Sequence, residues 1–188
     1  MTDHREPGPV PASLDMKLRL LYRVYEYLRD ADLTGESSTA RLLHAPDPAH
    51  LRARLADELA ELAGAADGTH QHQGLPGDAI LEASQVCYWT FLIAVAARLP
   101  YDELRPQECL TLAVPTLPGE AAALGQILAL GIRSGPGPVP AADLRAALRQ
   151  VGLICRALDI DPAAPVDYDL AQMRTRAYLA GFFQGSAT

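Results

Sequence analysis

The segment Leu51-Arg-Ala-Arg-Leu-Ala-Asp-Glu-Leu-Ala-Glu-Leu62 is the starting point for predicting the fold. Its leucines recur at the three- and four-residue spacing of one helix face, and Pro48 suits the first turn of such a helix. The segment therefore predicts an amphipathic helix over about residues 48–65. Glu58 and Glu61, spaced as E-x-x-E, lie beside the leucine stripe and project from one side of that helix.

A second long helix is predicted over about residues 78–98. It is apolar almost all round, as a buried central helix is, and Glu82 lies in its first turns. Its large apolar residues are Ile80, Leu81, Val86, Trp89, Phe91, Leu92, Ile93 and Val95.

Further helical patterns begin at Ser13 and recur at about 119–133, 141–158 and 168–183. Segments rich in proline and glycine separate the last three. No sustained alternation of apolar and polar residues predicts a strand. The fold class is therefore predicted to be all-α, with a helical bundle as the architecture.

Composition narrows the function classes. The 188 residues carry a formal charge of −7, which argues against a nucleic-acid-binding surface. The first residues lack the apolar core of a signal sequence, and we expect no membrane span. Three widely spaced cysteines without a C-x-x-C motif favour reduced thiols. These features predict a soluble cytoplasmic protein.

Three acidic residues on two predicted helices suggest chemistry. Glu58 and Glu61 on one helix, facing Glu82 on another, would offer the oxygen ligands that Mg²⁺ prefers. The alternative is that E-x-x-E forms an ordinary solvated helix face.

Four short motifs follow one another within residues 37–104. They are Ser38-Thr-Ala-Arg-Leu-Leu43, Asp57-Glu-Leu-Ala-Glu-Leu62, Glu82-Ala-Ser-Gln-Val-Cys-Tyr-Trp89 and Leu99-Pro-Tyr-Asp-Glu-Leu104. In this order they resemble the MazG-like and phosphoribosyl-ATP pyrophosphohydrolase superfamily of all-α enzymes. The resemblance covers about a third of the chain.

The resemblance implies a function and a cofactor. Glu58, Glu61 and Glu82 match the metal ligands of the family, which binds Mg²⁺, with Mn²⁺ as an alternative. The implied substrate is a nucleoside triphosphate or a phosphoribosyl-ATP-like nucleotide, hydrolysed to a monophosphate and pyrophosphate. A bound metal would lower the pKa of the attacking water and neutralise phosphate charge.

Three further positions enter through the same resemblance. Gln85 stands where the family has a ligating Asp, so the site is one charge short and Gln85→Asp is expected to strengthen Mg²⁺ binding. Asp78 lies on the same helix face and is either a substitute ligand or an N-cap. Arg41 would contact a substrate phosphate if the first motif match holds; otherwise it is an exposed arginine.

Other residues leave alternatives open. His70 and His72 lie in a loop rich in glycine, where they would bind a transition metal, touch a phosphate or simply belong to a flexible surface loop. Tyr88 and Trp89 would stack on a base or pack in the core.

The second part of the chain resembles a faded copy of the first. Residues 119–125 align with 57–63, and in this alignment Ala123 replaces Glu61. The predicted organisation is a flexible arm over 1–12, a MazG-like domain over 13–110 and a helical part over 111–188. The last part is either a degenerate repeat or a helical extension, which implies a pseudo-dimeric monomer or a homodimer. The rival to the enzyme is a catalytically inactive module of the same fold that binds a nucleotide or a protein.

Overall fold

The computed structural model describes residues 13–112 and 114–185, and all regular structure in these ranges is helical. The predicted all-α class is confirmed, while the arm predicted over 1–12 lies outside the described residues. The long helices are α1 (Leu14–Asp30), α3 (Pro48–Asp67), α4 (Gly77–Ala96), α7 (Pro118–Ser134), α8 (Ala141–Ala157) and α9 (Ala164–Arg174). The short ones are α2 (Ser38–His44), α5 (Tyr101–Leu104), α6 (Pro106–Thr111), the 3-10 helix η1 (Ala177–Leu179) and α10 (Ala180–Gly185).

Capping residues set several helix ends. The Ser13 hydroxyl accepts a hydrogen bond from the Met16 amide, and Ser37 does the same for the Ala40 amide. Asp47 caps α3. Pro48 lies in the first turn of this helix, as the sequence predicts. Gly68 ends α3 in the left-handed region at φ 82°, where a residue without Cβ is unstrained.

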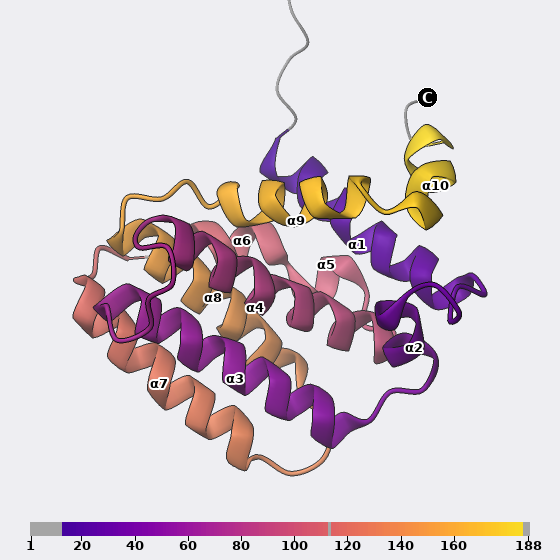
Figure 1. The fold of residues 1–188 in the computed structure, drawn as a ribbon. Helices are drawn as coiled ribbons and strands as arrows, with labels where there is room; N and C mark the ends of the chain where they lie inside the picture. Colours follow the sequence, from indigo (N-terminus) through magenta and orange to yellow (C-terminus); the bar gives the residue numbers. More distant parts are fainter. Residues whose placement is uncertain (1–12, 113, 186–188) are drawn as a thin grey trace, which may run out of the picture.

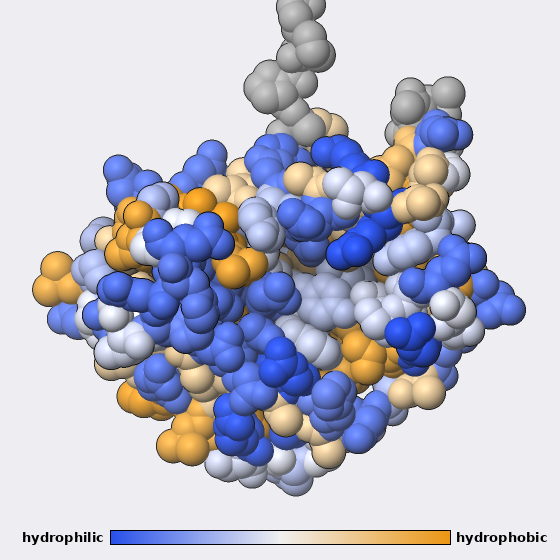
Figure 2. All heavy atoms as spheres, in the orientation of Figure 1, coloured by the Kyte–Doolittle hydropathy of each residue, from blue (hydrophilic) through white to orange (hydrophobic). Residues whose placement is uncertain are grey.

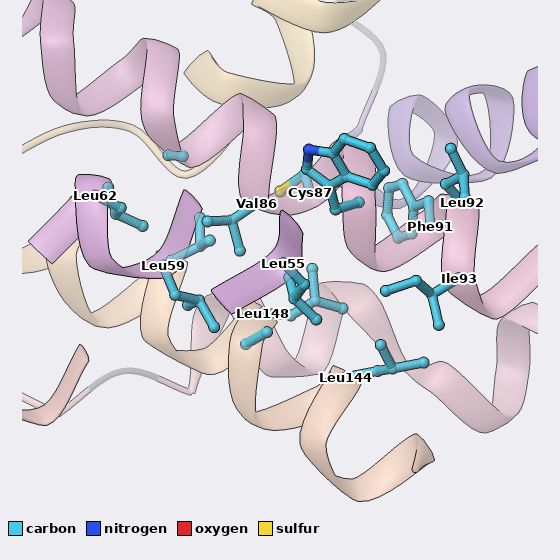
Figure 3. Close-up of a cluster of buried hydrophobic side chains, with 14 of the residues drawn as sticks. Leu55, Leu59, Leu62, Val86, Cys87, Phe91, Leu92, Ile93, Leu144 and Leu148 are labelled. Carbon is cyan, nitrogen blue, oxygen red and sulfur yellow. The ribbon is translucent and has the colours of Figure 1, made fainter. Parts of the chain in front are cut away.

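Four helices form the centre of the molecule. Helix α3 lies along α7, α4 lies along α8, and both α3–α4 and α7–α8 are in contact (Figure 1). Helices α1 and α9 pack on the remaining side of α4. Side chains from α3, α4 and α8 interdigitate in the core, where Leu55, Phe91 and Leu148 are fully buried (Figure 3).

Helix α4 is the most buried element, as predicted. Fourteen of its twenty residues are buried, against eleven of twenty in α3. By length and composition α4 is apolar enough to cross a membrane, but 72% of its most apolar window is buried inside the fold. Its apolar surface is therefore explained by the surrounding helices.

Two glycines allow close helix contacts. A Cβ on Gly125 of α7 would lie 3.0 Å from the Cβ of Ala63 on α3. A Cβ on Gly152 of α8 would lie only 2.2 Å from the carbonyl oxygen of Leu110 in α6. Helix α6 can thus rest directly on the backbone of α8 because position 152 has no side chain.

Arg52 joins the first part of the chain to the second. Its buried guanidinium on α3 donates to the carbonyl oxygens of Ile132 at 2.7 Å, Pro136 at 2.8 Å and Gly137 at 3.0 Å. These carbonyls lie at the end of α7 and just beyond it, where a helix leaves acceptors unpaired and carries partial negative charge. The Arg52 side chain on α3 therefore pairs the carbonyl groups at the C-terminal end of α7.

The predicted single helix over 168–183 is wrong. Helix α9 begins earlier, because Pro165 is favourable in a first turn, and it ends at Arg174. The Thr175 hydroxyl then donates to the carbonyl of Gln172 at 2.7 Å, a local bond that competes with helix continuation. The chain restarts only as η1 and α10.

The two predicted parts, 13–110 and 111–188, share one hydrophobic core. The helix order α3–α4 is followed by α7–α8 with equivalent neighbours, which is the order that a repeat requires. The degenerate repeat and the helical extension both stay predictions.

Candidate functional site

Three carboxylates converge between α3 and α4. Glu58 and Glu61 come from successive turns of α3, and Glu82 comes from the first turns of α4. One oxygen of each carboxylate lies within 4.8 Å of the others. We call Glu58, Glu61 and Glu82 the carboxylate cluster. Three acidic oxygens this close repel one another unless a proton or a cation compensates their charge.

Glu58 is the best-buried member of the cluster, with 3% of its surface exposed. Its Oε1 accepts a hydrogen bond from Trp89 Nε1 at 3.2 Å and contacts the guanidinium of Arg54. Burial raises the pKa of Glu58 to about 7, and the charges of Glu61 and Glu82 add to this effect, while Arg54 and Trp89 oppose it. Glu58 therefore changes charge near neutral pH.

Glu82 is also buried, at 4% exposed. Burial raises its pKa, and the neighbouring Glu61 carboxylate raises it further. The Nε2 of His70 lies 3.4 Å from Glu82 Oε1 and lowers the pKa in opposition. Glu61 is only partly buried, so it forms the solvent side of the cluster.

Asp78 does not join the cluster. Its carboxylate accepts hydrogen bonds from the backbone amides of His72 at 2.9 Å, Gln73 at 2.9 Å and Gly74 at 2.8 Å. These three bonds lower the pKa of Asp78. It also does not cap α4, whose N-cap is Pro76. Asp78 instead holds the loop that precedes its own helix.

That loop places two imidazoles beside Glu82. His70 Nε2 and His72 Nε2 are 3.1 Å apart, and these atoms and a Glu82 oxygen lie within 4.8 Å of one another. The loop lies at the surface, with His72 exposed and His70 partly buried, and Asp78 holds its backbone. The H-x-H spacing, followed by an acid in the next helix, is the sequence signal for this arrangement.

Gln85 lines a cavity of about 400 Å³ between α2, α4 and α9, whose lining does not include Glu58, Glu61 or Glu82. A hollow lies on this face below α9 (Figure 2). Arg41 is exposed, does not line that cavity, and donates to the carbonyl oxygen of Thr34 at 2.9 Å.

The cavity contains a residue that sequence reasoning missed. Asp169 on α9 is 9% exposed, and its Oδ2 accepts a hydrogen bond from the Tyr25 hydroxyl at 2.9 Å. Burial raises the pKa of Asp169 to about 6. Apart from Leu81 and Met173, the rest of the lining is polar or aromatic, including Ser38, Tyr88, Tyr168, Gln172 and Tyr178. No motif marks Asp169, because its partners lie far away in the sequence.

Tyr88 and Trp89, for which the sequence predicts either base stacking or core packing, lie in different surroundings. Trp89 is buried and donates to Glu58, so it packs in the core and also supports the cluster. Tyr88 lines the cavity, and its hydroxyl lies 3.0 Å from the Thr39 hydroxyl.

No protein-family model matches the chain, and neither curated proteins nor solved structures provide a match. The resemblance to MazG-like pyrophosphohydrolases therefore depends on the sequence motifs.

Proposed function

We propose that this protein is a divalent-cation-dependent nucleotide pyrophosphohydrolase with a MazG-like helical bundle. The observation that carries the proposal is the convergence of Glu58, Glu61 and Glu82 from two helices to within 4.8 Å. Buried carboxylates this close are costly in a stable core, and a hard cation such as Mg²⁺ or Mn²⁺ would compensate for that cost. The donor set, three carboxylates without a thiolate, suits such an ion.

The residues at the cluster have distinct roles in this proposal. Glu58, Glu61 and Glu82 would hold the ion, which when bound would neutralise phosphate charge and acidify a nearby water. Arg54, now against Glu58, would turn its guanidinium to a phosphate oxygen once a cation compensates that carboxylate. In the reaction a water oxygen bonds to the α-phosphorus and the water gives up a proton to the solvent, while the bond to the α–β bridging oxygen breaks and pyrophosphate leaves with the electron pair.

The neighbouring cavity supplies a place for the nucleoside. Gln85 lies about one helical turn after Glu82, so the cavity lining and the carboxylate cluster use neighbouring turns of α4. Its tyrosines offer ring faces, and Gln85 and Asp169 offer hydrogen-bonding groups for a base. Arg41 has no part in this arrangement, because it lies outside the lining.

The test is a panel of nucleoside triphosphates with Mg²⁺ or Mn²⁺ and a readout of released pyrophosphate. We expect release from at least one nucleotide, and loss of that release in Glu61→Gln. The matched control is Glu120→Gln, which removes an exposed acid from α7. Activity that survives Glu61→Gln would reject the cluster as the catalytic centre.

A second candidate is a catalytically inactive module that binds a nucleotide or a protein. The specific observation in its favour is Gln85, which leaves three carboxylates where the related enzymes have four acidic ligands. Nucleotide binding without any pyrophosphate release would support this alternative. The cytoplasmic location and the choice between homodimer and pseudo-dimeric monomer belong to the same proposal.

A further inference from the structure

We infer that His70, His72 and Glu82 form a mixed nitrogen and oxygen site for a first-row transition metal ion, such as Zn²⁺ or Co²⁺. The inference deepens the proposed function, on which it rests only through the shared Glu82, by naming an ion other than Mg²⁺ beside the carboxylate cluster. Imidazole nitrogens suit Zn²⁺ and Co²⁺, whereas Mg²⁺ favours oxygen ligands.

The ligand atoms have the separation that such an ion needs. His70 Nε2 and His72 Nε2 are 3.1 Å apart, and His70 Nε2 is 3.4 Å from Glu82 Oε1. Zinc-to-ligand bonds are roughly 2.0–2.2 Å, so ligand atoms around one tetrahedral ion lie somewhat more than 3 Å apart. Small side-chain rotations would therefore bring all three groups onto one ion.

The loop that carries the histidines is held in place by its backbone. Asp78 accepts three amide hydrogen bonds from residues 72–74, and the His70 amide donates to the Gly64 carbonyl at 3.0 Å. Gly64 also leaves room, since a Cβ there would lie 2.8 Å from the Cβ of His70. These contacts hold the backbone of the loop, and the rings are then positioned by the 3.1 Å contact between their Nε2 atoms and by the contact of His70 with Glu82.

A second observation comes from Glu82. Its side chain is 95% buried, and within residues 13–112 and 114–185 its one polar partner is the His70 ring. A buried carboxylate without a hydrogen-bond donor from the backbone is unfavourable unless a positive charge lies against it. A proton on the carboxylate or a cation against it removes this cost, and a cation would also use the two imidazole nitrogens that lie within 4.8 Å.

Charge and lone pairs around the site favour a cation. The two Nε2 atoms form a hydrogen bond of 3.1 Å in which one ring nitrogen accepts, so at least one imidazole offers a lone pair. The acidic groups facing them are Glu82 and, beyond it, Glu61 and Glu58. No lysine or arginine forms an ion pair with Glu82 among the described residues.

The test is calorimetric titration of the metal-stripped, full-length protein, made without a histidine tag, with Zn²⁺, Co²⁺ and Mg²⁺. We expect Zn²⁺ and Co²⁺ to bind at least about 100-fold more tightly than Mg²⁺, in line with their preference for imidazole. His70→Gln and His72→Gln should each weaken Zn²⁺ and Co²⁺ binding about tenfold or more and leave Mg²⁺ binding unchanged. In Co²⁺-loaded protein the visible absorption should lose its imidazole contribution in both variants.

The matched control is His44→Gln, which changes a histidine on α2 whose ring contacts the Ala31 carbonyl. Thermal unfolding of the metal-free variants identifies any that fail to fold. Wild-type Zn²⁺ affinity in both variants, or an equal loss of Mg²⁺ binding, would overturn the inference. The measurement is of binding, so a protein that releases no pyrophosphate would contradict the proposed function and leave this result standing.

Discussion

The helix pair α3–α4 and the pair α7–α8 build the same bundle in opposite ways. The first pair buries Arg52, Glu58, Asp78 and Glu82. The second pair buries Gln150 as its one long polar side chain, and α7 even presents apolar side chains to solvent, visible as orange spheres at the lower left of Figure 2. The exposed residues of α7 include Leu124, Ile127 and Leu130.

This difference distinguishes the residues that pack the bundle from the residues that could take part in chemistry. Both pairs contribute to one hydrophobic core, so the buried acids of α3 and α4 are not required for a helix in this position. Buried charge lowers stability unless something compensates it. The first pair therefore carries features that stability does not explain, and the second pair shows what the bundle needs without them.

The strongest test of the contrast is an exchange at aligned positions. Glu61→Gln should weaken Mg²⁺ binding by more than the roughly 10–100-fold typical of losing a supporting residue, because it removes a charged ligand. Ala123→Gln, at the aligned and exposed position of α7, should change nothing. Calorimetric titration measures both. Equal affinities in the two variants would mean that the acids of α3 form an ordinary solvated face.

Arg52 tests how firmly the two pairs depend on each other. Arg52→Ala leaves the carbonyls of Ile132 and Pro136 without their donor, which should cost roughly 3 kcal/mol of the free energy of unfolding. Arg133→Ala removes an exposed ion pair with Asp57 and should cost less than about 1 kcal/mol. Urea denaturation compares the two. A cost for Arg52→Ala no larger than its control would show that the pairs are joined by apolar packing alone.

The loop before α4 carries two histidines, the loop before α8 carries none, and Asp78 tests what the first loop provides. Asp78→Asn weakens three charge-assisted bonds that hold residues 72–74. Zn²⁺ affinity should fall roughly 10–100-fold, as for an outer supporting group, while Mg²⁺ affinity changes little. If Mg²⁺ binding falls most, Asp78 is a ligand of the carboxylate cluster after all.

The pH dependence of Mg²⁺ binding should arise from a residue of the α3–α4 pair. Since the pKa of Glu58 is raised to about 7, a proton occupies this carboxylate at lower pH and must leave before a cation binds. Mg²⁺ affinity should therefore fall about tenfold per pH unit below pH 7 and level off above it. Titrations between about pH 5.5 and 8.5 measure this, and Glu58→Gln should flatten the profile near neutrality. An unchanged profile would assign the titration to another group.

The smallest effect is expected at Gln85. The resemblance predicts that Gln85→Asp strengthens Mg²⁺ binding, but the side chain lines the cavity that also contains Asp169. We therefore expect an increase of less than about tenfold, from charge acting over a distance. Titration in low salt measures it, with Gln172→Asp in the same cavity as the control. A large increase specific to position 85 would show that the side chain reaches the cation.

Local sequence pattern was sufficient for much of the fold. The leucine stripe and Pro48 predicted α3, and the apolar run of α4 predicted the most buried helix. These predictions succeeded because a helix face is recorded in residues three and four apart. The helix predicted over 168–183 failed because Thr175 offers the backbone a local alternative that periodicity does not reveal.

Only part of the candidate site could be predicted from the sequence, for a related reason. Glu58, Glu61 and Glu82 lie close in the sequence and their convergence followed from two neighbouring helices. Asp169 meets Tyr25 across 144 positions, and such contacts leave no local pattern. The role of Asp78 was missed because its side chain binds backbone amides, and any residue type can donate those.

Gly152 has a consequence for interpreting mutational surveys. Any side chain at this position would meet the backbone of Leu110, so nearly every substitution should be damaging, even alanine. A saturation screen would therefore rank position 152 beside residues of an active centre, although glycine has no functional group to lose. Intolerance there reports the distance between α6 and α8, and a map of function drawn from intolerance alone would place a site where there is only a helix contact.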